Sequence, residues 1–149
     1  MIRTVGYMTD AIYFNEMNRK VIAEFRENGG RAGGIAEGRP LVLVHHIGAK
    51  SGIERITPLV PYIDGDRIYI FASKGGSPEH PAWYHNLVAN PSTTVEYGTQ
   101  TFPATARVLS GPERDEVYAK QVAVQPQFGE YARNTDRVIP VIELRRTGH

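Results

Sequence analysis

The sequence predicts a mixed α+β fold that is mainly antiparallel β, a small barrel of about six strands with helices around it. Strand-like runs follow one another with short turns, which favours antiparallel pairing because parallel strands need long crossovers. Helical patterns lie near the start, the middle and the end of the chain. The length of 149 residues, of which 41% are hydrophobic, suits one core. We therefore expect one domain over 1–149, with an N-terminal helical segment at 1–30.

The first helix is predicted from apolar residues that recur at helical spacing. They are Phe14, Met17, Val21, Ile22 and Phe25. Thr9 or Asp10 can cap this helix, and the Asn-Gly-Gly sequence at 28–30 ends it. The glycine-rich stretch at 31–38 is then expected to be a loop.

The first strand is predicted over 40–47, where a continuous apolar and β-branched run is typical of a buried strand. After a break at 48–52, the extended pattern resumes over 54–62. Asp64-Gly65 is a hairpin signal, and it predicts a turn into a strand over 67–72.

The same signals predict the remaining elements in order. These are a loop at 74–80, a helix at 81–90, strands at 93–97 and 101–109, a helix at 112–121, a short helix after Pro126 and a strand at 137–144. Pro81 suits the first turn of its helix. Pro140 cannot donate to a sheet ladder, so we expect the closing strand at an edge of the sheet.

Composition excludes several classes of function. Lys+Arg 17 against Asp+Glu 16 gives a net charge of +1, which argues against a nucleic-acid partner. The absence of cysteine excludes a disulfide scaffold, a thiolate metal site and a cysteine nucleophile. The first residues lack the apolar run of a signal peptide, and no stretch reaches bilayer length. We therefore expect a cytoplasmic protein with no integral membrane segment.

Two glycine-rich turns could bind an anion. The first, Gly48–Gly52, carries Lys50 and Ser51 and is followed by Arg55, so backbone amides, a hydroxyl and two cations suit a phosphate or phosphodiester. The second, Ala72–Gly76, carries Lys74 and could converge on the same ligand. The plainer interpretation is a pair of ordinary turns with solvated basic residues.

Two further segments could line a pocket. Trp83 and Leu87 share a helical face beside Asn86, which suits a planar heteroaromatic ligand, although Trp83 could equally be a core anchor. Phe128 and Tyr131 lie three residues apart on a short helix and could form a wall over a pocket. Core packing is the simpler interpretation of Phe128, whereas the phenol of Tyr131 could donate a proton.

The sequence shows no signature of a metal site, a hydrolase or a Rossmann fold. His45 and His46 are adjacent in a strand and point to opposite faces, so they cannot easily share an ion. His80 and His85 do not have the spacing of a helical metal pair. Neither a Gly-x-Ser-x-Gly elbow nor a Gly-x-Gly-x-x-Gly fingerprint is present. We therefore expect no metal.

Taken together, these motifs resemble the deazaflavin-dependent nitroreductase family of the flavin/deazaflavin oxidoreductase superfamily. The resemblance runs from about Phe14 to Leu144. It is carried by Gly48–Gly52 with Arg55 and Thr57–Leu59, by Ala72–Gly76, by His80–Tyr84 with Asn86, Leu87, Asn90 and Pro91, and by Thr135–Arg137 with Ile139–Val141.

The resemblance implies a split β-barrel of the FMN-binding type that binds coenzyme F-420, an 8-hydroxy-5-deazaflavin with an anionic side chain. It implies a set of cofactor-binding residues on the two turns, the second strand and the central helix. These are Ala49, Lys50, Ser51, Arg55, Ile56, Thr57, Pro58, Leu59, Val60, Phe71, Ala72, Ser73, Lys74, Ala82, Trp83, Tyr84, His85 and Asn86. It also implies a substrate pocket at Phe128, Tyr131 and Asn134, with Tyr131 as the catalytic residue.

The implied activity is hydride transfer from reduced coenzyme F-420 to an electron-poor small molecule, such as a quinone, an enone or a nitroaromatic compound. Two alternatives stay open: an FMN-dependent oxidoreductase on the same barrel, and a non-catalytic deazaflavin-binding protein. Phe128 and Asn134 stand where nitroimidazole-reducing members have tyrosines, so reduction of nitroimidazoles does not follow. A homodimer is a further expectation.

Overall fold

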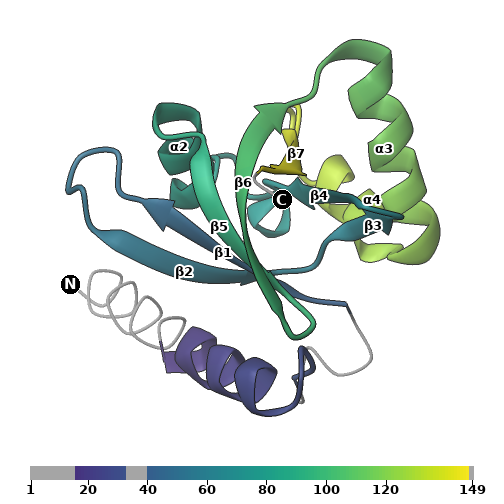
Figure 1. The fold of residues 1–149 in the computed structure, drawn as a ribbon. Coiled ribbons are helices and arrows are strands. Elements are labelled where there is room, and N and C mark those ends of the chain that lie inside the picture. Colours follow the sequence, from purple (N-terminus) through teal and green to yellow (C-terminus); the bar gives the residue numbers. More distant parts are fainter. Residues whose placement is uncertain (1–15, 33–39, 148–149) are drawn as a thin grey trace, which may run out of the picture.

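The computed structural model describes residues 16–32 and 40–147. In this part of the chain, seven strands form one sheet in the order β2-β1-β5-β6-β7-β4-β3 (Figure 1). The strands are β1 (Val42–Ile47), β2 (Glu54–Leu59), β3 (Tyr62–Asp64), β4 (Arg67–Phe71), β5 (Ser92–Tyr97), β6 (Gln100–Val108) and β7 (Val141–Arg146). The helices are the N-terminal helix over 16–27, the one-turn 3-10 helix η2 (Lys74–Gly76), α2 (Ala82–Ala89), α3 (Gly111–Val124) and α4 (Gln127–Arg133).

Every neighbouring pair in the sheet is antiparallel, which confirms the predicted antiparallel barrel with peripheral helices. β2 and β3 are the two edges of the sheet, yet only Val60 and Pro61 separate them in the chain. The sheet must therefore curl to bring its edges together. The extended run predicted over 54–62 is therefore divided between two strands at opposite edges of the sheet. The chain leaves one edge at this bend and joins the other, so the two edges meet there and the half-barrel closes.

β1 is buried on both of its faces. Val42 and Val44 point into the barrel, where they pack with residues of β4, β5, β6 and β7. Leu43, together with Leu41 before the strand, points outward and packs against Phe25 of the N-terminal helix. This two-sided burial explains why the sequence of β1 is a continuous apolar run rather than an alternating one.

The helix α2 closes the inside of the barrel. Trp83 and Leu87 are buried in the same cluster as the inward side chains of the strands. Pro81 is the N-cap of α2, as expected from its fixed backbone angle, and the helix ends before Asn90. The predicted helix at 81–90 is therefore confirmed.

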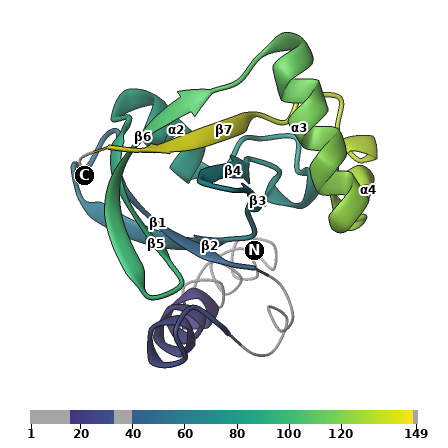
Figure 2. The same ribbon diagram turned by 45° about the vertical axis from the view of Figure 1, so that its right-hand side comes forward.

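On the other side of the sheet, α3 and α4 cover β4 and β7 (Figure 2). The ring of Phe71 lies edge-on to Tyr118 at 5.8 Å and to Phe128 at 5.5 Å. The Tyr118 hydroxyl donates to the Phe128 carbonyl at 2.6 Å, which joins the two helices. The predicted helix at 112–121 is longer than expected, because it continues to Val124.

The closing strand differs from its prediction. β7 lies between β6 and β4 and is not an edge strand. Pro140 precedes the strand, so no ladder hydrogen bond is lost, and its carbonyl accepts from the Ala72 amide at 3.0 Å. The predicted loop at 74–80 also contains the turn of η2. Thr9, Asp10, Phe14 and most of the predicted loop at 31–38 lie outside the described residues.

An ion pair fastens the N-terminal helix to the outer face of the sheet. The guanidinium of Arg26 donates to both carboxylate oxygens of Glu96 on β5, at 3.0 and 2.7 Å. His45 of β1 lies 2.7 Å from the same carboxylate. The hydrogen bond from Arg26 is the main reason that the pKa of Glu96 is lowered from its ordinary value. Among the described helices, none is long and apolar enough to cross a bilayer.

We predict that Glu96→Gln lowers the free energy of unfolding at pH 7 by about 1–2 kcal/mol, because a charge-assisted hydrogen-bond pair between the buried Glu96 carboxylate and the half-exposed Arg26 guanidinium is lost. The folded-state pKa of Glu96 lies below the ordinary value of 4.5, so its stabilisation is present above that pH and is lost as the pH falls through the folded pKa. Urea unfolding of wild type and variant at pH 7 and pH 3 measures this, and the difference should shrink at pH 3.

Glu116→Gln is the control, because Glu116 pairs with Lys120 on the exposed surface of α3 at 3.4 Å. Its effect should stay within about 0.5 kcal/mol. Equal effects of the two substitutions at pH 7 would show that the Arg26–Glu96 pair does not anchor the N-terminal helix.

Candidate functional site

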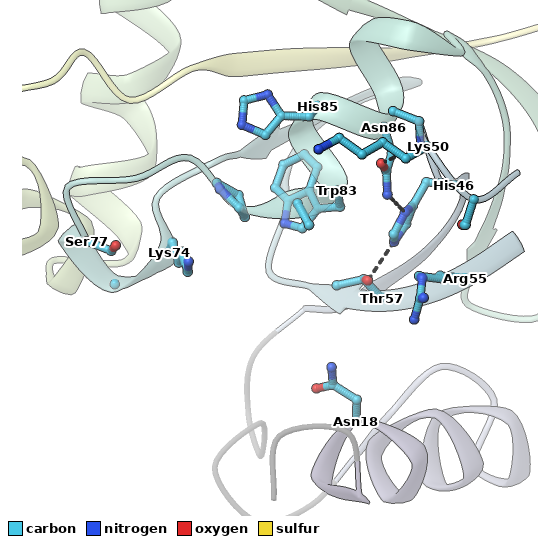
Figure 3. A pocket seen from close by; sticks show the side chains of 16 residues that line it. Asn18, His46, Lys50, Arg55, Thr57, Lys74, Ser77, Trp83, His85 and Asn86 are labelled. Carbon is cyan, nitrogen blue, oxygen red and sulfur yellow. Dashed lines mark hydrogen bonds between the residues drawn. The ribbon is translucent and has the colours of Figure 1, made fainter. Parts of the chain in front are cut away.

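An open cleft of about 1400 Å³ lies between the β1–β2 turn, η2 and the start of α2 (Figure 3). Its lining comes from elements that are far apart in the sequence. The lining residues are Asn18, His46, Gly48, Ala49, Lys50, Ser51, Arg55, Thr57, Lys74, Gly75, Ser77, Pro81, Ala82, Trp83, His85 and Asn86. Both glycine-rich turns that the sequence singles out therefore border one cleft.

The first turn, Gly48–Gly52, connects β1 to β2. It is closed by hydrogen bonds from the Gly48 amide to the Ile53 carbonyl and from the Gly52 amide to the Gly48 carbonyl, both at 2.9 Å. Gly52 has a φ of +70°, the left-handed conformation that favours glycine. The described residues provide no ion pair for Lys50 or Arg55, so both cations remain available to an anion in the cleft.

The second turn brings Lys74 to the cleft in a conformation that is uncommon for a residue with a side chain, with a φ of +46°. Gly76 must be glycine, because a Cβ there would lie 2.8 Å from the Tyr131 carbonyl oxygen of α4. The tight contact with α4 therefore holds this turn. Lys74 lies 4.0 Å from Glu79, and both side chains are exposed, so the ion pair is weak.

The helix α2 contributes an apolar wall and a polar rim. Trp83 is buried in the barrel core and also borders the cleft, so the two interpretations of this residue from the sequence are compatible. Ala82, His85 and Asn86 border the cleft beside it. Figure 3 shows the Trp83 indole between the His46–Asn86 pair and Lys74.

His46 is the most deeply buried polar group of the cleft, with an exposed fraction of 3%. Its Nε2 lies 2.8 Å from the Thr57 hydroxyl, and its Nδ1 lies 2.9 Å from the amide nitrogen of Asn86. Burial, followed by the charges of Arg55 and His45, lowers the pKa of His46 to about 4. The imidazole is therefore neutral at physiological pH. His45 points to the opposite face, towards Glu96, as the sequence predicts.

Arg137 fastens the second turn from behind. Its guanidinium donates to the carbonyls of Ala72 at 3.1 Å, Ser73 at 2.8 Å and Ser77 at 2.9 Å. It also lies 2.9 Å from Nδ1 of His80. Burial lowers the pKa of Arg137, and burial followed by the charge of Arg137 lowers that of His80. This one side chain ties the segment before β7 to the backbone that carries Lys74.

Other residues predicted for the cofactor site lie elsewhere. Ile56 and Val60 pack under the N-terminal helix, and Pro58 lies opposite Leu43 in the same part of the sheet. Leu59, Ala72 and Tyr84 pack in the barrel core, whereas Phe71 packs under α3 and α4. Ser73 is buried, and its carbonyl accepts from Arg137.

The predicted substrate-pocket residues are not in the lining of this cleft. Phe128 is buried under α3, which supports its interpretation as a core residue. Tyr131 is half-buried, with its ring 5.2 Å from that of Phe128. Asn134 caps the C-terminal end of α4 and lies beside Gly76. Tyr131 and Asn134 adjoin Gly76 of the second turn.

Sequence reasoning missed several residues that border or support the cleft. Asn18, His46, Ser77 and Pro81 line it, and Arg137 holds one of its turns. The alternation along β1 that argues against a metal shared by His45 and His46 also places His46 on the inward face, at the cleft. No local pattern singles out Asn18, and the motif at 135–137 gives no sign of the contacts that Arg137 makes, because these contacts cross the fold.

A second hollow, of about 660 Å³, lies elsewhere on the sheet near β7 and the turns after β3 and β5. It has basic residues too, Arg67, Arg145 and Arg146, but Glu143 and Asp66 lie among them. The Arg145 guanidinium donates to Glu143 at 2.8 Å. No group of three or more metal-ligating side chains is found among the described residues.

We predict that Arg137→Lys speeds amide exchange at Gly76 and Ser77 by about tenfold or more, because loss of one or two buried hydrogen bonds costs about 1–3 kcal/mol locally. Those two amides donate to the Ser73 and Lys74 carbonyls within the turn. Hydrogen exchange followed by NMR measures the effect. Arg133→Lys, on the exposed side of α4, is the control, and equal exchange in both variants would contradict the fastening role of Arg137.

The chain has clear relatives. Residues 16–145 match the model of a family described as "F420H(2)-dependent quinone reductase". One protein with that name, from Mycobacterium tuberculosis, is 38% identical over 128 residues, which cover 83% of this chain and 86% of the relative.

Solved structures agree with this match. One described as an F420-H2 dependent reductase, FDR-A, has a TM-score of 0.67 and 42% identity, and the match covers 72% of this chain and 95% of that one. Another, described as a domain-swapped dimer, has a TM-score of 0.68 and 38% identity and covers 92% of this chain and 98% of that one. The split-barrel fold and the resemblance to deazaflavin-dependent oxidoreductases are thereby confirmed. The chain belongs to the F420H(2)-dependent quinone reductase family, whose members are oxidoreductases that use reduced coenzyme F-420.

Proposed function

We propose that the cleft binds reduced coenzyme F-420 and that the protein reduces a quinone there. The observation that carries this proposal is that Lys50 and Arg55, which have no ion pair within the described part of the chain, lie on one cleft, with Lys74 across from them and an indole between. A planar ring with a long anionic side chain fits such a cleft, because the ring can contact Trp83 while the anionic groups reach the turns.

The first turn is suited to a phosphodiester. Its backbone turns tightly through Gly48 and Gly52, and Lys50, Ser51 and Arg55 add donors on the same side. Gly75 of the second turn is open, since a Cβ there would meet nothing within 4 Å. Lys74 beside it offers a further cation to a side chain that carries several negative charges.

When bound, the reduced deazaflavin supplies a hydride from its C5 atom to the electron-poor acceptor. The residues of this chain orient the two molecules and exclude water, which can account for most of the rate enhancement. Trp83 and Ala82 give the cleft an apolar wall next to the ring. No protein group needs to form a covalent bond to the substrate.

We further propose that the proton required by the acceptor comes from the Tyr131 hydroxyl or from water. Tyr131 is half-buried on α4, and among the described residues its hydroxyl has no hydrogen-bond partner. The backbone of α4 at this residue touches Gly76 of the second turn. An acceptor that extends past this turn could therefore reach the phenol.

Turnover tests the proposed activity. Oxidation of reduced coenzyme F-420 by menadione, measured as the gain in absorbance of the oxidised deazaflavin, should depend on the protein and saturate with menadione. An enone and a nitroaromatic compound in the same assay define the acceptor range. Tight binding of the coenzyme without turnover would instead favour a carrier protein, and equal dissociation constants for FMN and F-420 would favour a flavin enzyme.

We predict that Lys50→Ala and Arg55→Ala each weaken binding of oxidised coenzyme F-420 by about 1.5–3 kcal/mol, or roughly ten- to a hundredfold in Kd, because each loses a charge-assisted hydrogen bond. Titration by fluorescence or calorimetry at moderate salt measures this. Lys120→Ala on the exposed face of α3 is the matched control and should bind as wild type does. Wild-type affinity in both cleft variants would remove the basis of the proposal.

We predict that Tyr131→Phe keeps coenzyme affinity within about twofold but lowers kcat with menadione by about ten- to a hundredfold, at the low end of general-acid effects. Tyr131→Ala should mainly raise KM through lost stacking. If Tyr131 is only a packing residue, Tyr131→Ala lowers the melting temperature and leaves the kinetics of the folded protein unchanged. Steady-state kinetics and thermal unfolding of both variants separate the two roles.

We also propose that the protein is a cytoplasmic homodimer. A structural relative is described as a domain-swapped dimer, and its match covers 92% of this chain. The cysteine-free sequence is compatible with a reducing compartment. Light scattering of the eluted protein measures the mass, and a single species near 16.6 kDa would contradict the dimer.

A further inference from the structure

A chain of buried hydrogen bonds runs from the first turn to the inside of the cleft. It begins at the Ala49 backbone amide, passes through the Asn86 side chain and the His46 ring, and ends at the Thr57 hydroxyl (Figure 3). Asn86 and His46 are both buried, with exposed fractions of 8% and 3%. Each group in such a chain has to match the next one as donor or acceptor.

The direction of the chain is set at its first link. A backbone amide can only donate, and the Ala49 amide lies 2.9 Å from Oδ1 of Asn86. The oxygen of the Asn86 amide is therefore the acceptor, which leaves its nitrogen, a donor, facing His46. The distance from this nitrogen to Nδ1 of His46 is 2.9 Å. Nδ1 of His46 must accept, so it carries no proton.

The second link follows from the first. A neutral imidazole with an unprotonated Nδ1 carries its proton on Nε2, and Nε2 lies 2.8 Å from Oγ1 of Thr57. His46 therefore donates to Thr57. The Thr57 oxygen accepts this bond, and its own proton must point elsewhere. Among the described residues no acceptor is found for that proton, and Thr57 borders the cleft.

We propose that His46 is a positioning residue that makes the Thr57 hydroxyl a hydrogen-bond donor to an acceptor atom of the bound cofactor ring, such as a carbonyl oxygen. This inference rests on the proposed function, because the ligand of the cleft is taken to be the deazaflavin. The same histidine ties this donor, through Asn86, to the turn that carries Lys50. The site that contacts the ring and the turn that holds the anionic side chain are thus built as one unit.

These hydrogen bonds make the cleft selective for a ligand atom that accepts a hydrogen bond from the Thr57 hydroxyl. A hydroxyl that is free to rotate can serve a donor or an acceptor equally well, whereas a Thr57 oxygen already engaged by His46 favours an acceptor. A ligand that presented an N–H group there would place two hydrogen-bond donors face to face. His46 stays neutral because its ring is buried and both of its nitrogens are paired.

The donor and acceptor roles in this row of hydrogen bonds can be measured in the protein without ligand. Nitrogen-15 chemical shifts and couplings of the His46 ring distinguish the two neutral tautomers, and we expect the form protonated on Nε2 at every pH from 5 to 8. The form protonated on Nδ1, or titration of this ring near the ordinary value of 6.5, would overturn the proposal.

Binding of the oxidised coenzyme tests the consequence. Thr57→Val, which keeps the shape and removes the hydroxyl, should raise Kd by about three- to tenfold, whereas Thr57→Ser should stay within about twofold. His46→Phe should also weaken binding, and the double variant His46→Phe with Thr57→Val should lose less than the product of the two single losses. Multiplicative losses would mean that His46 does not act through Thr57.

Two outcomes separate this inference from the function on which it rests. If the wild-type protein does not bind coenzyme F-420, the proposed function fails, and the proposed contact fails with it. If the wild-type protein binds the coenzyme and the Lys50→Ala variant binds it more weakly, but Thr57→Val binds as wild type does, only the present inference is wrong. Should His46→Phe fail to fold, the tautomer measurement and the Thr57 variants still decide the case.

Discussion

The burial of β1 on both faces is the constraint on which the rest of the molecule depends. Its inward residues, Val42 and Val44, complete the barrel core, and its outward residue, Leu43, seats the N-terminal helix. Because side chains alternate along a strand, the two histidines that follow must also divide between the faces. His45 joins the ion pair outside, and His46 enters the cleft. The turn that leaves this strand then starts at the rim of the cleft.

Charge is distributed unevenly, although the chain is almost neutral overall. The buried carboxylates Glu96 and Glu143 are paired with arginines on the outer face of the sheet. The cations at the cleft have either no ion pair among the described residues or, for Lys74, a weak one. The cleft is therefore locally basic, although the net charge of the protein is only +1. An anionic ligand would meet a favourable potential there without a strongly basic protein surface.

Much of the fold could be predicted because it is encoded locally. The apolar run of β1, the Asp64-Gly65 turn and the proline before α2 each determine their neighbourhood within a few residues. The predictions that differ from the structure concern features that depend on residues distant in the sequence. Nothing local shows that the chain changes edges at Pro61, or that the strand after Pro140 is inserted between two others.

In the candidate site, too, some features can be predicted from the local sequence and others depend on distant contacts. Both turns can be predicted from the sequence, because their glycines allow a tight backbone turn and their lysines add positive charge. His46 and Asn86 are 40 residues apart, and Arg137 and the Ala72 carbonyl are 65 apart. No pattern within one element therefore reveals that these pairs are hydrogen-bonded. Several residues implied by the resemblance, such as Ile56 and Phe71, face away from the cleft, because strand residues alternate between its two sides.

A crystal structure of the protein with oxidised coenzyme F-420 tests the central claim most directly, namely that one cleft holds both the ring and the anionic side chain. We expect phosphate oxygens within hydrogen-bond distance of Lys50 or Arg55, the ring beside Trp83, and a ring carbonyl oxygen within that distance of Thr57 Oγ1. Coenzyme bound instead in the hollow near Arg67, Arg145 and Arg146, with the cleft empty, would contradict it.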